Sequence, residues 1–206
     1  MIDTLLAMDP AIIAAFLAAG VVLNLTPGAD VMFASACGIS GGWRSGVAAA
    51  AGVALGSVLH VALAVLGLSA ALLALPHAGA AIRWAGAAYL AWLAWGAWHA
   101  PAPRLGQGVQ HPARAIWRGF VTNALNPKVA LFIMAFLPQF LTPGAGPVWQ
   151  QTLALGLIFI TTGFVITGGY GAAAGLFGAR LGRAQGWMNR VAAVVFGGLA
   201  ARIVLD

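Results

Sequence analysis

The sequence predicts an all-α integral membrane protein with six transmembrane helices, built as two inverted three-helix repeats with broken helices 1 and 4. Three observations carry this prediction: a scarcity of charge, six long apolar stretches, and a short motif that occurs once in each half. Lys and Arg number 10 and Asp and Glu number 4, so charged residues make up 7% of the 206 residues, against roughly 25% in a soluble domain. With 62% apolar residues, the chain could not cover a soluble surface with polar groups.

Each of the six apolar stretches is long enough to cross the hydrocarbon core, which takes about 20 helical residues. The first stretch follows Asp3 and Asp9 and has no basic residue before it, so we expect a retained helix and not a cleaved signal. Several Trp residues fall near predicted ends, where indole rings favour the membrane interface, whereas Trp92 and Trp95 fall inside the third stretch and are expected to pack. The stretches are residues 10–34, 46–74, 79–99, 118–141, 150–178 and 187–205.

Basic residues are divided unevenly between the two sides of the predicted bundle. Because basic loops stay in the cytoplasm, both termini are predicted on the non-cytoplasmic side. The basic loops that set this orientation account for the net charge of +6, so no nucleic-acid partner is expected. We expect a single membrane domain, 1–206, with repeats of about 1–100 and 115–206 joined by a basic loop of about 100–117. The predicted cytoplasmic loops hold Arg44, Arg104, Arg114, Arg118, Arg180, Arg183 and Arg190, and the opposite side holds Arg83 and Arg202.

The first and fourth stretches each carry an Asn followed by a polar residue and Pro, deep within an apolar run. The two prolines are 100 residues apart, about half the chain. Because each half contains three stretches, the second half crosses in the opposite sense, which predicts an inverted repeat. The two motifs are Asn24-Leu25-Thr26-Pro27-Gly28-Ala29-Asp30 and Asn123-Ala124-Leu125-Asn126-Pro127-Lys128.

A proline inside a helix removes one backbone hydrogen bond and clashes with the carbonyl four residues earlier. Pro27 is expected to free the carbonyl of Leu23, and Pro127 that of Asn123; in hydrocarbon such groups must find a partner or line a polar cavity. The dipeptides at the two breaks, Thr26-Pro27 and Asn126-Pro127, are each predicted to be the N-cap and the first residue of a new half-helix. The exposed N–H groups of such a half-helix attract anions.

Two charges accompany these breaks. Asp30 is the only acidic residue within a predicted span, and Lys128 is the only Lys in the chain. A charge at the bilayer centre costs at least about 2.5–3.5 kcal/mol, so both are predicted to be functional. His60, near the middle of the second stretch, is a second candidate for proton transfer. No residue cluster has metal-ligand spacing and no phosphate loop is present, so neither a metal site nor a cofactor is expected.

The motifs resemble those of the LysE/RhtB family of amino-acid exporters, whose first helix carries a Pro-Gly-Pro-Asp/Asn motif and whose fourth carries Asn-Pro-Lys. Ala29 stands where the family usually has its second Pro. The resemblance implies a secondary transporter that exports amino acids or close derivatives across the bacterial inner membrane, by proton antiport with alternating access, and no enzyme activity. The family-like positions are Thr26 to Asp30, Asn123 to Lys128, Ala130-Leu131-Phe132 and Leu137-Pro138-Gln139-Phe140.

A zwitterionic amino acid suits the two charges. Its carboxylate would lie at the half-helix N-termini and Lys128, and its ammonium at Asp30; a single intramembrane acid favours a neutral substrate. The expected partners are this substrate, protons and the lipid bilayer. Whether the chain forms a homo-oligomer is left open by the sequence. An exporter of another small solute, a channel-like pore and, with less support, a membrane-embedded enzyme are the alternatives. The predicted substrate-binding residues are Asp30, Lys128, Asn24, Thr26, Pro27, Gly28, Asn123, Asn126 and Pro127, with Asp30 and His60 as proton-coupling candidates.

Overall fold

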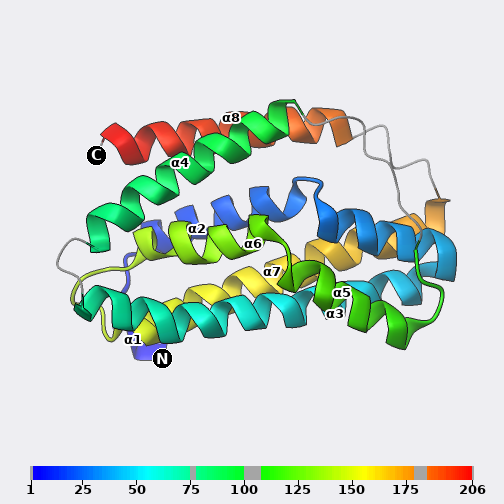
Figure 1. Ribbon diagram of the computed structural model, residues 1–206, viewed down its shortest axis with the longest axis horizontal. Coiled ribbons are helices and arrows are strands. Elements are labelled where there is room, and N and C mark those ends of the chain that lie inside the picture. Colours follow the sequence, from blue (N-terminus) through cyan, green and yellow to red (C-terminus); the bar gives the residue numbers. More distant parts are fainter. Residues whose placement is uncertain (1, 75–77, 100–107, 179–184, 206) are drawn as a thin grey trace.

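The computed structural model describes residues 2–74, 78–99, 108–178 and 185–205. These residues form helices and short connections without a β-strand, which confirms the all-α prediction. The helices run back and forth along the long axis of the molecule, and the chain begins and ends at the same end (Figure 1). Three of the orienting residues, Arg104, Arg180 and Arg183, lie outside the described residues.

The first predicted span, residues 10–34, is broken into two helical parts, and a short helix precedes it. α1 (Ile2–Ala7) is followed by α2 (Pro10–Leu25), whose N-terminus is capped by the Asp9 carboxylate, 2.8 Å from the backbone nitrogen of Ala11. α2 ends before Pro27, which cannot supply the next backbone donor, and α3 (Ala29–Ala74) begins three residues after Thr26.

α3 contains a sharp turn at Gly42, whose φ of 76° and ψ of 174° are not helical. Glycine adopts this positive φ without steric cost. Figure 1 shows the chain reversing direction there, and Gly38 and Gly46, on either side of the turn, both contact Gly171. The first part of α3 therefore continues the first predicted span, and the remainder is the second.

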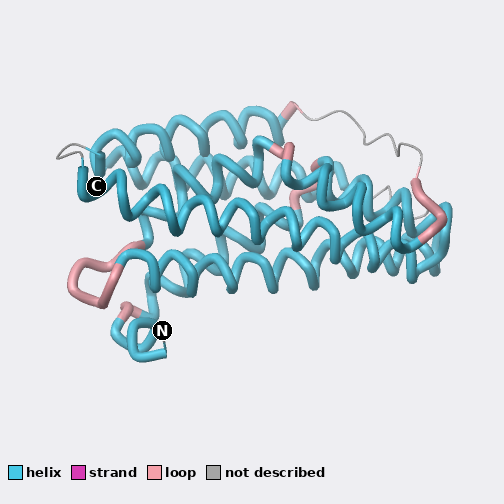
Figure 2. Tube along the Cα trace, turned by 60° about the horizontal axis from the view of Figure 1, so that its bottom comes forward, coloured by secondary structure: helices cyan, strands magenta, loops and turns pink. Residues whose placement is uncertain are grey.

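The fourth predicted span is also broken. α5 (Pro112–Ala124) is followed by α6 (Pro127–Leu131), a π-helical turn η1 (Phe132–Phe136) and a 3-10 turn η2 (Leu137–Phe140). The two parts, Pro112–Ala124 and Pro127–Phe140, are bent by 53°. This broken helix runs opposite to the one formed by α2 and the first part of α3, and the two breaks lie together (Figures 1 and 2).

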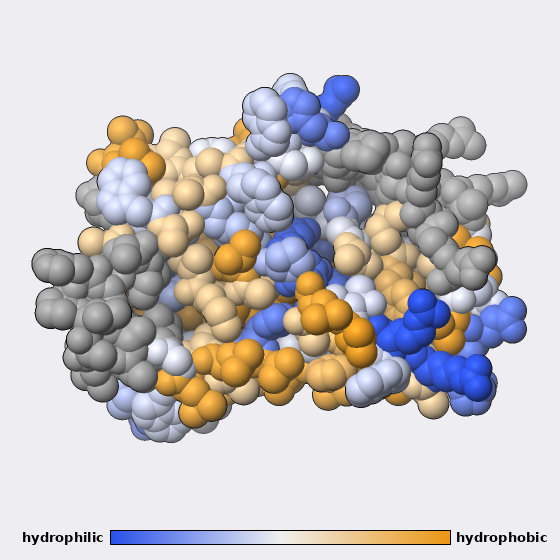
Figure 3. Space-filling view, viewed as in Figure 1, coloured by the Kyte–Doolittle hydropathy of each residue, from blue (hydrophilic) through white to orange (hydrophobic). Residues whose placement is uncertain are grey.

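The remaining helices are α4 (Ala78–Trp98), α7 (Val148–Phe177) and α8 (Gln185–Leu205). Among the described residues, two helical segments are long and apolar enough to cross a membrane, Ala29–Gly67 and Val148–Phe177; the bent pair makes a third if it counts as one span. The surface seen in Figure 3 is largely apolar, and hydrophilic residues gather at the end where α5 begins.

Glycines allow α3 to approach its neighbours closely. A Cβ built on Gly171 of α7 would lie 2.7 Å from the carbonyl atoms of Gly46, and one on Gly56 would lie 2.7 Å from the side chain of Asn123 in α5. The Gly-x-x-x-Gly motifs at 52–56 and 171–175 therefore pack helices within the bundle, as small residues do in membranes.

Trp92 packs against Tyr89 and Trp95 against His99, but both rings lie at the surface, because their side chains are 54% and 69% exposed. α4 contributes Leu90, Leu93 and Ala97 to the core, and this spacing of three and four residues turns the two indole rings to the outer face. In a bilayer such a face meets lipid.

Candidate functional site

A small cavity lined by both polar and apolar side chains lies at the two helix breaks, which meet near the middle of the bundle (Figure 1). Its volume is about 20 Å³, little more than the space that one water molecule needs. Pro27 and Pro127 shape the breaks without lining the cavity, and His60 lies just behind its wall. The predicted residues that line it are Asn24, Thr26, Gly28, Asp30, Asn123, Asn126 and Lys128.

Lys128 reaches across the cavity to the first broken helix. Its Nζ donates to the carbonyl of Leu23 at 2.8 Å and to that of Thr26 at 2.9 Å. The first of these is the carbonyl that Pro27 is predicted to free, so this prediction is confirmed. Gly28 lies beside the Lys side chain, since a Cβ there would be in van der Waals contact with Nζ at 3.5 Å.

Asp30 reaches in the other direction, to the second broken helix. Its Oδ2 accepts from the side-chain amides of Asn123 at 2.8 Å and Asn126 at 3.0 Å. Its Oδ1 is buried and has no hydrogen-bond partner among the described residues. Each charged group thus forms hydrogen bonds with neutral groups at the break of the opposite helix, and none of these hydrogen bonds joins Asp30 to Lys128.

The predicted cap at the second break is confirmed, and the one at the first is wrong. The Asn126 side chain accepts from the backbone nitrogen of Lys128 at 3.0 Å, with Pro127 as the first residue of α6. The Thr26 hydroxyl instead donates back to the Val22 carbonyl at 2.6 Å and closes α2. This bond to the carbonyl four residues earlier is a common alternative for Thr, and it leaves α3 to begin after Gly28.

Asn123 connects the cavity to the helix behind it. Besides its bond to Asp30, its Oδ1 accepts from the Ser57 hydroxyl at 3.3 Å, and its carbonyl lies 3.0 Å from His60 Nε2. This carbonyl is the one that Pro127 is predicted to free; the backbone nitrogen of Asn126 also donates to it, at 2.8 Å. His60 Nδ1 is buried without a partner among the described residues.

Several cavity residues were not predicted. Ser57 and Thr167 add hydroxyls, and Phe159 and Phe164 add apolar walls. The position of Ser57 three residues before His60, on the same helix face, is the one sequence signal that could have indicated it. Tyr89 of α4 also contributes by donating its hydroxyl to the Lys128 carbonyl, and nothing in its local sequence indicates this.

Asn24 lies at the edge of the cavity and contacts α7. Its amide donates to the Thr162 hydroxyl at 3.4 Å, and a Cβ built on the neighbouring Gly163 would lie 3.4 Å from the same amide. The Asn24 amide therefore does not donate to the freed carbonyl of Leu23, which accepts from Lys128 Nζ.

Comparison with known proteins relates most of the chain to one family. Residues 21–206 match the family model described as LysE type translocator. The chain is 33% identical over 179 residues to an uncharacterized membrane protein of Vibrio cholerae, covering 85% of each chain. No solved structure matches.

Relatives with named activities are efflux proteins. The homoserine/homoserine lactone efflux protein of Salmonella typhimurium is 34% identical over 160 residues, which cover 76% of this chain and 77% of the relative. The leucine efflux protein of Klebsiella pneumoniae is 34% identical over 138 residues, covering 63% and 65%. A cysteine/O-acetylserine efflux protein of Escherichia coli is 31% identical over 137 residues, covering 66% and 69%.

Proposed function

Because this chain belongs to the LysE type translocator family, we propose that it exports neutral amino acids or close derivatives across the bacterial inner membrane. Its relatives of known activity are bacterial efflux proteins and not enzymes. The chain is a bacterial membrane protein and a transporter; the substrate class, the membrane and the mechanism are our proposals.

The observation that carries the proposal is that Lys128 and Asp30 lie in one cavity and each binds groups of the opposite broken helix, an arrangement that we call the crosswise site. Two carbonyls of one broken helix hold an ammonium, and two amides of the other hold a carboxylate. An α-amino acid carries these same two groups. The substrate site that we propose comprises Asp30, Lys128, Asn24, Thr26, Gly28, Asn123 and Asn126, with Pro27 and Pro127 holding the breaks open.

We further propose six transmembrane spans in two inverted repeats of three. The turn at Gly42 divides α3 into two spans, and the two broken helices run in opposite directions with their breaks together (Figure 1). A cavity of about 20 Å³ cannot hold an amino acid. Transport therefore requires the halves to move apart, first on one side and then on the other, as in alternating access.

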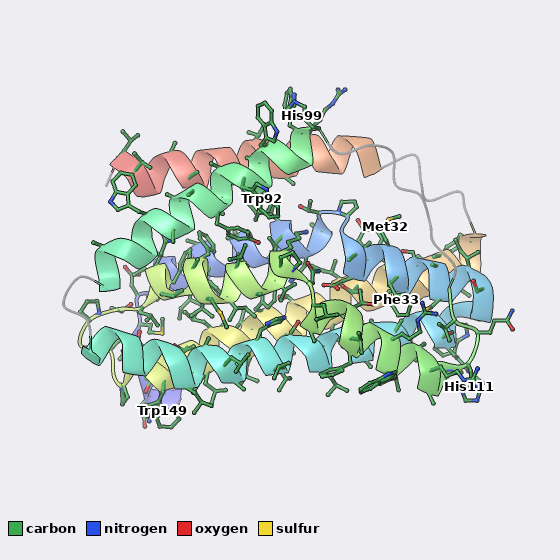
Figure 4. The ribbon with its side chains drawn as sticks, in the orientation of Figure 1. Met32, Phe33, Trp92, His99, His111 and Trp149 are labelled. Carbon is green, nitrogen blue, oxygen red and sulfur yellow. The ribbon has the colours of Figure 1, made fainter. Side chains whose placement is uncertain are left out.

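For the orientation, we propose that both termini lie on the non-cytoplasmic side. His111, which precedes Arg114 at the start of α5, lies at the end of the bundle away from the C-terminus (Figure 4). The Gly42 turn and Arg44 lie at that end too, because Ser45 donates to the carbonyl of Val109. Basic residues at one end support a cytoplasmic position for that end.

Export by proton antiport requires a group that carries the proton, and Asp30 and His60 are the two candidates. His60→Gln tests the second. Glutamine can still donate to the Asn123 carbonyl that His60 Nε2 contacts, so we expect uphill flux in proteoliposomes to persist with a rate about two- to fivefold lower. Loss of all proton dependence in His60→Gln, with folding intact, would instead assign the proton to His60.

An efflux screen tests the proposed function itself. Cells that express the protein are loaded with single amino acids, and accumulation outside is compared with cells that carry an empty vector. We expect accelerated efflux of at least one neutral amino acid, with homoserine, leucine and cysteine as the first compounds because relatives are named for them. Uphill efflux that collapses when an uncoupler is added would distinguish the exporter from a pore, and no accelerated efflux across the full panel would contradict the proposal.

A further inference from the structure

The ammonium of Lys128 is held as a bound ligand would be. Its two acceptors, the carbonyls of Leu23 and Thr26, belong to the other broken helix and lie more than 100 residues away in sequence. Both carbonyls are at the C-terminal end of α2, where the helix dipole is negative and attracts a cation. The site is thus a preformed ammonium site of backbone oxygens, occupied by a side chain of the protein.

The carboxylate of Asp30 is held in the matching way. Two side-chain amides donate to its Oδ2, from Asn123 and Asn126, and these two residues are 0% and 7% exposed. Together the two side chains present to the protein the ammonium and carboxylate of an amino acid, each in its own subsite.

We propose that the Lys128 ammonium is a tethered substitute for that of the substrate, and that the Leu23 and Thr26 carbonyls are the subsite for the substrate's primary ammonium. The identity of the displacing ligand as an amino acid depends on the proposed function. Substrate binding is then an exchange: the incoming ammonium replaces that of Lys128 on the two carbonyls, and the released Lys128 binds the incoming carboxylate.

The size of the cavity supports an exchange over simple addition. With Lys128 in place, about 20 Å³ remains, and the Lys side chain lies against Gly28, where an added Cβ would be 3.6 Å from the Lys Cδ. When Lys128 leaves, the space beside Gly28 becomes free for the backbone of the ligand. A ligand with an ammonium but no carboxylate would release Lys128 without giving it a new partner, in a medium where an unpaired charge is costly. The native protein therefore selects zwitterions against simple amines.

The test uses n-propylammonium, which has the ammonium of an amino acid and no carboxylate. Its binding to the purified full-length protein in detergent is measured by calorimetric titration. Lys128→Met leaves the two carbonyls without their cation, so we expect it to bind n-propylammonium at least tenfold more tightly than the wild type does. Arg114→Met, which removes an exposed cation at the start of α5 and outside the cavity, is the matched control and is expected to behave as the wild type. Propionate, which lacks the ammonium, should show no such gain.

Equal affinity of Lys128→Met and the wild type for n-propylammonium would overturn the proposal, as would an equal gain for propionate. If Lys128→Met does not yield folded protein, Lys128→Gln is titrated in its place, with the same expected gain. The wild-type efflux screen is independent of this experiment: absence of amino-acid efflux together with the gain for n-propylammonium would refute the proposed function and keep the ammonium subsite. Amino-acid efflux by the wild type without the gain for n-propylammonium would keep the proposed function and refute the ammonium subsite.

Discussion

Asp30→Asn is expected to abolish uphill amino-acid efflux while exchange of amino acid across the membrane continues. The substitution keeps the shape of the side chain, and its amide oxygen can still accept from Asn123 and Asn126, which both donate to Oδ2 in the native protein. Folding should therefore be retained. A neutral amide cannot bind and release a proton in the transport cycle, so coupling is lost.

The measurement compares two assays in proteoliposomes. Uphill flux driven by an imposed pH gradient should fall at least 100-fold, and exchange of labelled for unlabelled amino acid should stay within about tenfold, because hydrogen bonds to a neutral acceptor are roughly half as strong as charge-assisted ones. Asp3→Asn is the control, since Asp3 is exposed in α1, far from the cavity in sequence. Uphill flux that survives in Asp30→Asn would remove Asp30 as the proton carrier.

Gly171→Val is expected to prevent stable folding. A Cβ at this position would meet the backbone of Gly46 at 2.7–2.9 Å, and Gly38 also contacts Gly171. Backbone atoms cannot move aside as a flexible side chain can, so α3 and α7 must separate. We expect a loss of about 3 kcal/mol or more, at the upper end of the usual cost of overpacking.

Gly169→Val is the matched control for this experiment, because it lies two residues earlier in α7 and a Cβ there has no atom within 4 Å. Both variants introduce the same β-branched residue into the same helix, so any difference between them reports packing and not helix propensity. The fraction of monodisperse protein after extraction and its melting temperature are measured. Similar values for Gly171→Val and Gly169→Val would show that the α3–α7 contact is not required for stability.

The sequence predicted those features of the site that depend on local covalent geometry. Proline at positions 27 and 127 determines which carbonyls lose their helical donors, so the free oxygens of Leu23 and Asn123 followed directly. The side chain of Asn126 caps α6 as expected. At the first break the same reasoning failed, because the Thr26 hydroxyl could either accept from a backbone N–H of the following helix or donate to the preceding turn, and it donates to the Val22 carbonyl.

The partners of the two charges could not be predicted from the sequence. Their opposite charges alone would suggest an ion pair between Asp30 and Lys128. The crossing of the broken helices instead places backbone carbonyls nearest to Lys128 and side-chain amides nearest to Asp30. The crossing brings together segments that are about 100 residues apart in the sequence. For the same reason Thr167 of α7 could not be assigned to the cavity, since nothing local distinguishes it from other threonines of that helix.

The decisive measurement is uphill transport by the purified wild-type protein. Proteoliposomes are given a defined pH gradient and a labelled neutral amino acid that the efflux screen has identified, and its accumulation is followed with and without an uncoupler. The crosswise site predicts accumulation against the concentration gradient, reversal when the pH gradient is reversed, and collapse with the uncoupler. Equilibration that is independent of the pH gradient, or no flux of any neutral amino acid, would contradict proton-coupled export through this site.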